Sequence, residues 1–549
     1  MTTPASNAPV RAPVPVVTPD VVREYAAKQG VCVRPVLRTV TDRQTGTATT
    51  VLIPCGSTRE SRCPPCAEKA RRLRMQQCAE GWHLADDPLP PEPEHDHDDP
   101  EDDDPEQEGE SPDDGEESSR RVRSTRRRSD AAELPKVPQE HRSVGRTFTT
   151  PDGKQFRPSM FVTLTLGSYG KVIPGAKGKH VPGAGSPVHP AGYDYRRAGK
   201  EALYFPRLFD RCIQNLRRCA GFKVQYFGAI EPQRRLAPHI HVALRGAIPR
   251  KVIKAVVKAT YLQLWWPSFE PEDEVYTDPD RLPEWDPVEQ TYRCPETGFP
   301  LPTWEQALDD LANDPDAKPA VVMRFGPQVD IQGIIAPSAD ADRSIRYLTK
   351  YLTKSVAETY SDPEYVDPAY EAHIDRLHAE VLYLPCSEAC ANWLRYGIQP
   401  KDAGPGLAPG LCPSKAHDRE NLGLGGRRVQ VSRAWSGKTL SEHRADRATV
   451  VREVLKEAGI EAPDADRMAA DVLADDGLPR FVWDDIPVAD RDYVHVVMGA
   501  VREAQRWRRE YEQAKQQAGA RASPSGGAVD SNSATTIPRP PDNQPNQVA

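Results

Sequence analysis

The chain has 549 residues, of which 55 are proline, 36 are glycine and only 38% are hydrophobic. At about 100–200 residues per domain, this length predicts two to four folded units, with long stretches outside any core. No run approaches the roughly 18 apolar residues of a membrane-spanning helix, and the first residues do not resemble a secretion signal. These features exclude an integral membrane protein, and we expect a cytoplasmic protein with no membrane partner.

The formal charge of −8 is unevenly distributed. Residues 86–117 hold 18 Asp or Glu and no Lys or Arg; without them, 72 Lys and Arg face 62 Asp and Glu, a balance of +10. An arginine-rich run at 120–128 follows this acidic block. Runs of like charge repel themselves and stay unfolded, so this part of the chain is expected to be a linker. The basic remainder is compatible with binding to nucleic acid.

A helix is predicted after Thr18-Pro19, and strands and helices alternate from residue 158 onward. In chain order these are a strand at 160–166, a helix at 194–219 that Pro206 should kink or split, strands at 222–231 and 239–246, a helix at 250–264, an insertion at 267–318 with a helix near 303–312, one or two strands at 320–334, and a helix at 340–357 with Asp342 as N-cap. Two further helices are expected, at 441–459 and 490–516. The order predicts an α+β fold, with an antiparallel sheet and helices on one face.

Composition and motifs together predict seven segments. They are a disordered N-terminus (1–18), a Cys-rich zinc-binding unit (19–85), a disordered acidic and Arg-rich linker (86–142), a catalytic domain (143–360), a second Cys/His zinc-binding unit (361–440), a helical region (441–517) and a disordered tail (518–549).

His239-Ile240-His241 lies on a predicted strand. Residues two apart on a strand face the same side, so both imidazoles project together and can bind one divalent ion. Glu231 ends the preceding strand, and the turn between the strands brings it alongside as a third ligand. The alternative is a pair of surface histidines on a half-buried strand.

The predicted helix at 340–357 carries Tyr347, Lys350, Tyr351 and Lys354. On a helix each tyrosine and each lysine has its partner four residues away, which places ammonium groups beside phenols. A nearby cation favours the phenolate and can hold a phosphate. The alternative is an amphipathic helix with aromatic residues at the edge of its buried face.

Two cysteine clusters have spacings that suit tetrahedral zinc. The first is Cys32, Cys55, Cys63 and Cys66, and the second is Cys386, Cys390, Cys412 and His417. Free thiols are the alternative for both. Arg71, Arg72 and Arg74 follow the first cluster on a predicted helix, where they can meet phosphates. A phosphate-binding loop at 437–439 is rejected, because Ser432 stands where the motif needs glycine.

The histidine strand followed by the Tyr/Lys helix resembles the HUH endonucleases, and within them the rolling-circle replication initiators. The three family motifs match residues 161–165, 238–241 and 350–354, in that order. The wider context, including EPQRRLAPHIHVALRGAIPR and RYLTKYLTKS, is similar to the initiators of actinomycete plasmids and integrative conjugative elements. The resemblance covers about residues 30–440.

The resemblance implies an HUH core with a ferredoxin- or RRM-like sheet, whose histidines and Glu231 hold Mg²⁺ or Mn²⁺. It implies that Tyr351 attacks origin DNA and leaves a 5′-phosphotyrosyl link and a free 3′-OH. The partners implied are double- and single-stranded origin DNA, a host helicase and a host DNA polymerase. Tyr347 stands where many plasmid members have a carboxylate, which makes it a candidate second nucleophile.

Two other functions are compatible with these motifs. A conjugative relaxase or HUH transposase shares the chemistry, but relaxases usually place the tyrosine before the histidines. A non-enzymatic, zinc-containing DNA-binding regulator would not need the Tyr/Lys helix.

Overall fold

The computed structural model describes residues 18–84, 128–135, 148–149, 151, 153, 155–176, 179, 181–220, 223–336, 338–360, 366–425, 428–457, 474, 477–486 and 493–521. Almost all of the predicted disordered ends, and most of the predicted linker at 86–142, lie outside the described residues. The chain divides into two compact units, one of residues 1–36 and 52–444 and the other of residues 37–51 and 445–549. The finer domain boundaries inferred from the sequence stay predictions.

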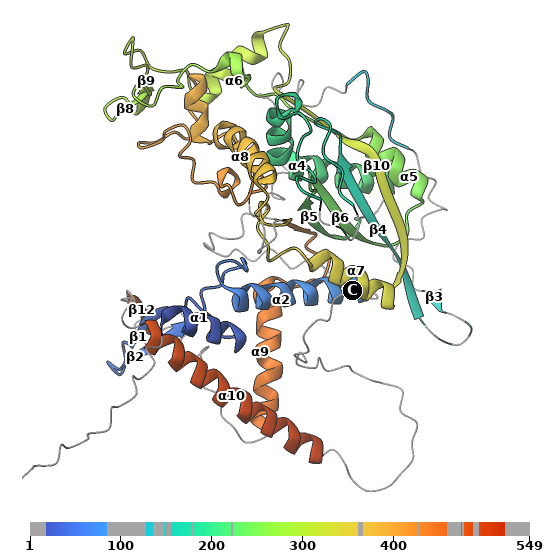
Figure 1. Cartoon of the computed structure of the whole chain (residues 1–549), viewed down its shortest axis with the longest axis vertical. Coiled ribbons are helices and arrows are strands. Elements are labelled where there is room, and N and C mark those ends of the chain that lie inside the picture. The colour runs from blue at the N-terminus through green and yellow to red at the C-terminus, as the bar shows by residue number, and fades with distance from the viewer. Residues whose placement is uncertain are drawn as a thin grey trace, which may run out of the picture. The chain divides into compact units, whose positions relative to one another are not determined.

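The first unit is built on a mixed α/β arrangement around one antiparallel sheet (Figure 1). Among the described residues this sheet has seven strands, in the order β11-β5-β6-β4-β10-β7, with β3 paired to β4. The strands are β3 (Phe148–Thr149), β4 (Gln155–Leu166), β5 (Tyr226–Pro232), β6 (Pro238–Arg245), β7 (Tyr261–Leu264), β10 (Val321–Ala336) and β11 (Val429–Val431). The predicted antiparallel sheet is confirmed, and β10 is one long strand with an irregularity between Phe325 and Val329.

The helices of this unit are α1 (Pro19–Lys28), α2 (Pro64–His83), α4 (Tyr195–Ala220), α5 (Arg250–Ala259), α6 (Trp304–Asn313), α7 (Ala339–Thr349) and α8 (Pro368–Tyr383). A two-stranded β8 (Glu284–Asp286) and β9 (Thr291–Arg293) hairpin lies in the insertion. The predictions for α1, which follows Thr18, and for α6 are confirmed.

The two faces of the sheet carry different cores. Ile240, Val242 and Leu244 of β6 pack into a large core with residues of α4 and α5. Ala243 of β6 faces the other way, into a smaller core that contains residues of α2 and α7. The expectation that helices cover one face only is therefore wrong. Side chains alternate along a strand, and on both faces of this sheet apolar positions need covering.

Of two other helix predictions, one is wrong and one is wrong in part, for reasons that lie in tertiary packing. Pro206 does not split α4, which runs through it as one helix. Burial of Phe205 and Phe209 against the sheet outweighs a cost of roughly 3 kcal/mol for an interior proline. The segment 250–264 is not one helix, because α5 ends at Ala259 and β7 pairs with β10 at the sheet edge.

The helix that carries Tyr347 also differs from its prediction. α7 is capped by Ser338, whose side chain accepts a hydrogen bond from Ala341 N, and Asp342 lies in its first turn. The helix ends at Thr349, eight residues before the predicted end at 357. Tyr351 therefore lies on a turn beyond the helix. The prediction that Tyr347 and Tyr351, and likewise Lys350 and Lys354, are paired four residues apart on one helix is wrong.

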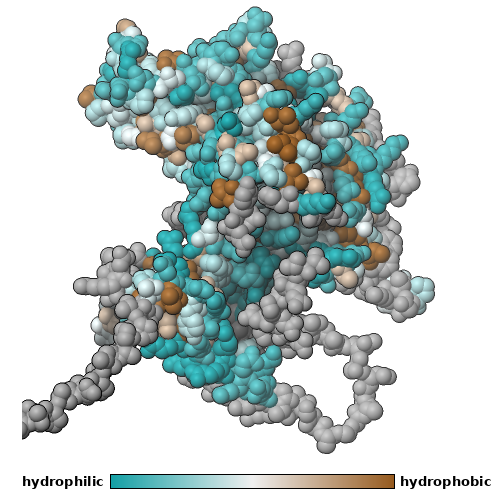
Figure 2. Space-filling model, viewed as in Figure 1, coloured by the Kyte–Doolittle hydropathy of each residue, from teal (hydrophilic) through white to brown (hydrophobic). Residues whose placement is uncertain are grey.

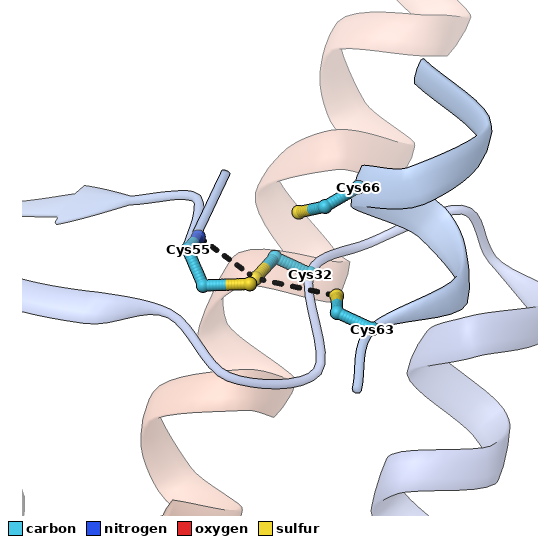
Figure 3. Close-up of side chains that lie close together, drawn as sticks. All are labelled: Cys32, Cys55, Cys63 and Cys66. Atoms are coloured by element: carbon cyan, nitrogen blue, oxygen red, sulfur yellow. Dashed lines mark hydrogen bonds between the residues drawn. The ribbon is translucent and has the colours of Figure 1, made fainter. Parts of the chain in front are cut away.

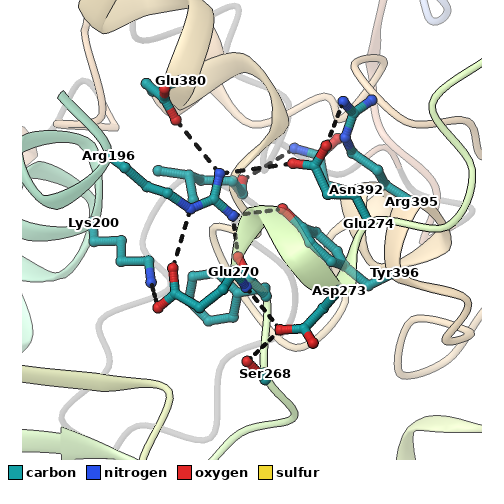
Figure 4. Close-up of polar contacts among 12 residues, drawn as sticks. Arg196, Lys200, Ser268, Glu270, Asp273, Glu274, Glu380, Asn392, Arg395 and Tyr396 are labelled. Atoms are coloured by element: carbon teal, nitrogen blue, oxygen red, sulfur yellow. Dashed lines mark hydrogen bonds and ion pairs between the residues drawn. The ribbon is translucent and has the colours of Figure 1, made fainter. Parts of the chain in front are cut away.

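A network of partly buried charges fastens α4 to the insertion and to α8 (Figure 4). At its centre, Arg196 of α4 is paired with Glu270, Glu274 and Glu380. Lys200, one turn further along α4, contacts Glu270 at 2.5 Å, and Arg395 contacts Glu274 at 2.8 Å. The network balances three carboxylates against three cations, so its role is to hold these elements together.

The second unit contains a three-stranded sheet in the order β12-β1-β2, from β1 (Val36–Asp42), β2 (Ala48–Ile53) and β12 (Phe481–Ile486). Its helix α10 is Tyr493–Arg521, and α9 (Leu440–Glu457) begins at the end of the first unit. Both helices were predicted. No helix among the described residues combines the length and apolar character needed to cross a bilayer. On the face shown in Figure 2, hydrophobic residues (brown) lie in several separate places.

Ile240 provides a test of the α4-side core, because it lies between the two histidines but is 0% exposed on the opposite face. We expect Ile240→Ala to lower the free energy of unfolding by about 2–5 kcal/mol, through lost burial and a residual cavity. Val288→Ala, at a site 87% exposed, should change it by less than about 0.5 kcal/mol. Urea denaturation followed by circular dichroism measures both, and equal effects would contradict the assigned burial.

Candidate metal and tyrosine site

Three neighbouring strands place the polar residues of the site on the α7 side of the sheet. In the strand register, Glu231 of β5 lies opposite His239 of β6, and Thr163 of β4 lies opposite His241. Because Ile240 points to the α4 side, both imidazoles point to the α7 side. The two-residue spacing and the hairpin register thus bring together the three predicted ligands.

The ligand atoms of Glu231, His239 and His241 all lie within 4.8 Å of one another. The Nε2 atoms of the two histidines are 2.9 Å apart, and His241 Nε2 is 4.0 Å from a Glu231 carboxylate oxygen. His241 Nδ1 is 2.9 Å from the Thr163 hydroxyl, which fixes the orientation of the ring. Thr163 lies within the family motif at 161–165, but the sequence alone did not predict that it contacts His241.

Burial controls the charge of this cluster. It lowers the pKa of His239 to about 4, and burial together with the neighbouring His239 lowers that of His241 to about 3. Burial raises the pKa of Glu231 to about 7, opposed by the charges of Arg428 and Lys350. Both imidazoles are neutral at pH 7, as metal ligation requires. Within the described part of the chain, Glu231 Oε1 is buried without a hydrogen-bond partner.

Tyr347 reaches this cluster from α7. Its hydroxyl is 3.4 Å from His241 Nε2, and its ring is 4.9 Å from the His241 ring. Phe161 of β4 stacks on His241 and meets Tyr347 edge to face. The side chain of Tyr347 remains 44% exposed, so a ligand can reach it. Burial, and then the charge of Glu231, raises the pKa of Tyr347, so the phenol is protonated at neutral pH.

Tyr351 and the two lysines lie on or next to the turn after α7. The Lys350 ammonium is 4.8 Å from the centre of the Tyr351 ring, as expected for a cation beside this phenol. The hydrogen bond to the histidines is made by Tyr347, although the sequence motif favours Tyr351. Lys354 contributes its carbonyl oxygen, which accepts hydrogen bonds from Arg59 and Arg428.

Tyr360 is a residue near the site that the sequence did not identify. Its hydroxyl donates to the carbonyl of Pro232, at the end of the strand that carries Glu231, over 3.0 Å. Burial is the main cause that raises the pKa of Tyr360 to about 12, and the nearby charges of Glu231, Tyr351 and Tyr347 raise it further. No periodic pattern marks this residue, because it lies outside the regular elements.

The first cysteine cluster forms where a loop after α1, the end of β2 and the start of α2 meet (Figure 3). The sulfur atoms of Cys32, Cys55, Cys63 and Cys66 all lie within 4.8 Å of one another, and those of Cys32 and Cys63 are 3.8 Å apart. The amides of Arg34 and Cys55 donate hydrogen bonds to the Cys32 sulfur. The cluster can hold a metal such as zinc, because sulfurs about 2.3 Å from a tetrahedral zinc lie about 3.8 Å apart.

The second cluster joins Cys386, Cys390, Cys412 and His417, whose ligand atoms also lie within 4.8 Å of one another. The Cys386 and Cys412 sulfurs are 3.9 Å apart, and Cys390 Sγ is 3.6 Å from His417 Nε2. His417 Nδ1 lies 2.7 Å from the carbonyl of Val381, so Nδ1 carries the proton and Nε2 faces the thiols. This donor set is also suited to a metal such as zinc.

Residues 18–485 match the family described as RepSA, replication initiator protein, pSAM2. The match spans most of the chain, which therefore belongs to this family of plasmid replication initiators. No curated protein and no solved structure matches the chain.

The low pKa values of the two histidines can be tested directly. In buffer without Mg²⁺ or Mn²⁺, we expect His239 and His241 to show no ring titration between pH 5 and 8. In the unfolded chain their pKa would be about 6.5, so below that pH the unfolded state binds protons that the folded state does not. The free energy of unfolding should therefore fall as the pH drops from 6.5 towards 4. NMR of histidine-labelled protein, assigned with His239→Gln and His241→Gln, measures this. A midpoint near 6.5 for either ring would contradict the burial of the pair.

Proposed function

We propose that the protein starts rolling-circle replication of a plasmid or integrative element by nicking and rejoining DNA at the origin through a tyrosine. The observation that carries this proposal is the Tyr347 hydroxyl beside two neutral imidazoles and a buried carboxylate. Membership of a replication initiator family supports origin DNA as the substrate. Host helicase and polymerase are the partners that unwinding and 3′-end extension require.

Glu231, His239 and His241 would hold the divalent ion. When bound, that ion supplies Lewis-acid polarisation of the scissile phosphate. Two imidazole nitrogens and one carboxylate oxygen suit Mn²⁺ better than Mg²⁺, which prefers a shell of oxygen ligands. The orphaned buried oxygen of Glu231 fits this role, because a ligand would provide its missing partner.

The tyrosine supplies the nucleophile. Its phenol oxygen bonds to phosphorus while the bond from phosphorus to the 3′-oxygen breaks. The phenol proton passes to water, and the leaving 3′-oxygen takes a proton from water. The strand then ends in a free 3′-OH on one side and a 5′-phosphotyrosyl link on the other. Since one ester replaces another, a later attack by a 3′-OH rejoins the strand without a nucleotide cofactor.

We propose that Tyr351 and Tyr347 both serve as nucleophiles. Tyr347 is supported by its position against His241, and Tyr351 by the sequence motif and by the Lys350 ammonium over its ring. Lys350 and Lys354 would also attract the DNA phosphates. Alternation between two tyrosines would let one protein start and end successive rounds.

Peptide mapping of the covalent adduct on a single-stranded origin oligonucleotide tests the nucleophiles. We expect wild-type protein to form adducts on both tyrosines, and Tyr347→Phe and Tyr351→Phe each to keep an adduct on the remaining one. The double variant should form none. Adducts on a single tyrosine would contradict alternation, and an adduct on neither would remove the endonuclease proposal and favour a DNA-binding regulator.

The His pair should be needed for cleavage but not for DNA binding, because its ligand acts on the phosphate at the scissile position. We expect His241→Ala to reduce adduct formation at least about a hundredfold, equivalent to several kcal/mol of lost transition-state stabilisation. Affinity for the origin oligonucleotide, measured by fluorescence anisotropy, should change less than about threefold. Cleavage by this variant at the wild-type rate would refute the site.

We further propose that each cysteine cluster binds one structural zinc ion. Zinc would stabilise loops that are too polar to form their own core. Purified protein should contain close to two zinc ions per chain by elemental analysis, and Cys63→Ser or Cys390→Ser should each lower this to about one. Absence of zinc, with rapid modification of all these thiols, would contradict both assignments.

A further inference from the structure

The turn after α7, residues 350–356, is held by hydrogen bonds to its backbone carbonyls and amides from distant parts of the first unit. The carbonyl of Thr353 accepts from the amide of Glu60 over 2.8 Å, and the carbonyl of Lys354 accepts from Arg59 Nη1 over 3.3 Å. The amide of Val356 donates to the carbonyl of Glu420 over 2.8 Å. These contacts use groups that a continuing helix would use itself.

The sequence in this turn contains no helix breaker. Lys350-Tyr351-Leu352-Thr353-Lys354 is compatible with continuation of α7, which is why a helix to 357 is expected from the sequence. The tertiary contacts therefore determine where the helix ends. They also determine where Tyr351 lies, because a continued helix would place it one turn beyond Tyr347.

Arg59 links this turn to the first cysteine cluster. It lies in the loop between Cys55 and Cys63, and Glu60, which contacts Thr353, is its neighbour in the same loop. The second guanidinium nitrogen of Arg59 donates to the side chain of Asn421. The position of Arg59 thus depends on a loop whose two ends are fixed at Cys55 and Cys63.

Arg428 links the same turn to the histidine site. Its guanidinium donates to the carbonyls of Tyr351 and Lys354, and its own carbonyl accepts from the amide of Ile230 over 2.7 Å. Ile230 precedes Glu231 on β5. Arg428 is only 6% exposed, so its guanidinium interacts with these carbonyls and not with solvent. Two buried or half-buried guanidiniums therefore converge on the carbonyls that follow the C-terminus of α7, where cations are favoured.

We propose that Arg59 and Arg428 are positioning residues that hold the Tyr351 turn against the Glu231/His239/His241 cluster. We further propose that Arg59 makes this position depend on metal in the Cys32/Cys55/Cys63/Cys66 site. The inference rests on the proposed function for its consequence in cleavage, but the state of the turn can be measured without DNA. The metal site thereby regulates whether Tyr351 is in place.

Hydrogen–deuterium exchange of full-length, DNA-free protein tests the positioning step. In Arg59→Ala, we expect amides in a peptide covering 350–357 to exchange at least about tenfold faster than in wild type. Arg62→Ala is the matched control. Arg62 is in the same loop but pairs at the surface with the side-chain carboxylate of Glu420, 3.3 Å away, whereas the turn is held by the backbone carbonyl of Glu420. Exchange in this control should stay within about twofold of wild type.

Arg59→Lys separates position from charge. A lysine keeps the charge but cannot present the guanidinium's fork to two acceptors, so exchange should fall between wild type and Arg59→Ala. This variant also carries the test if Arg59→Ala loses zinc or fails to fold. The proposal is overturned if Arg59→Ala exchanges no faster than Arg62→Ala. If Arg59→Ala cannot be measured, the same comparison is made with Arg59→Lys.

The metal dependence is tested with Cys55→Ser in otherwise zinc-loaded protein. We expect the 350–357 peptide to exchange faster both in this variant and in wild-type protein stripped of zinc. Added zinc should restore slow exchange in the stripped wild-type protein but not in Cys55→Ser. Exchange unchanged by loss of this metal would overturn the regulatory step while leaving Arg59 as a positioning residue.

Adduct mapping connects the turn to cleavage. Arg59→Ala should lose the Tyr351 adduct at least about tenfold more than the Tyr347 adduct, because Tyr347 is on α7 itself. Equal losses at both tyrosines would contradict selective positioning. If wild-type protein forms no adduct, the proposed nuclease function fails, whereas the exchange experiments still decide whether Arg59 holds the turn.

Discussion

The alternation of side chains along β6 is the constraint on which the rest of the site depends. Ile240 must enter the core against α4, and this fixes His239 and His241 on the opposite face. A slip of one residue in register would place both imidazoles in the α4-side core and Ile240 among the ligands of the α7-side cluster. The stability of the fold and the geometry of the ligand cluster are therefore set by the same strand pairing.

The sequence predicted those parts of the structure that depend on short-range periodicity. The antiparallel strands and the His pair with Glu231 depend on spacings that a strand or a hairpin turn imposes locally. The cysteine sets converge in space even though Cys32 and Cys66, or Cys386 and His417, are separated by long stretches of chain. Residue type was enough here, because few other roles gather thiols in this way.

The failures have a common physical origin in contacts between distant segments. Nothing near Thr349 signals the end of α7, because the groups that capture the following carbonyls come from Arg59 and Arg428. Pro206 is tolerated because large aromatic side chains on either side of it are buried. Tyr360 and the Arg196 network were missed for the same reason. Their partners are distant in the sequence, so no local pattern marks these residues.

The second unit has an unusual consequence for synthesis. β1 pairs with β12 in register from Leu37 opposite Ile486 to Asp42 opposite Phe481, so its partner strand is made more than 400 residues later. At about 5–20 residues per second, a ribosome needs roughly 20 to 90 seconds to cover that distance. During this interval one edge of β1 lacks its partner, while the intervening segments that form the sheet of the first unit are already emerging. Order of translation thus favours an early-forming first unit and a late closure of this small sheet, and until then the unpaired edge of β1 is open to other strands.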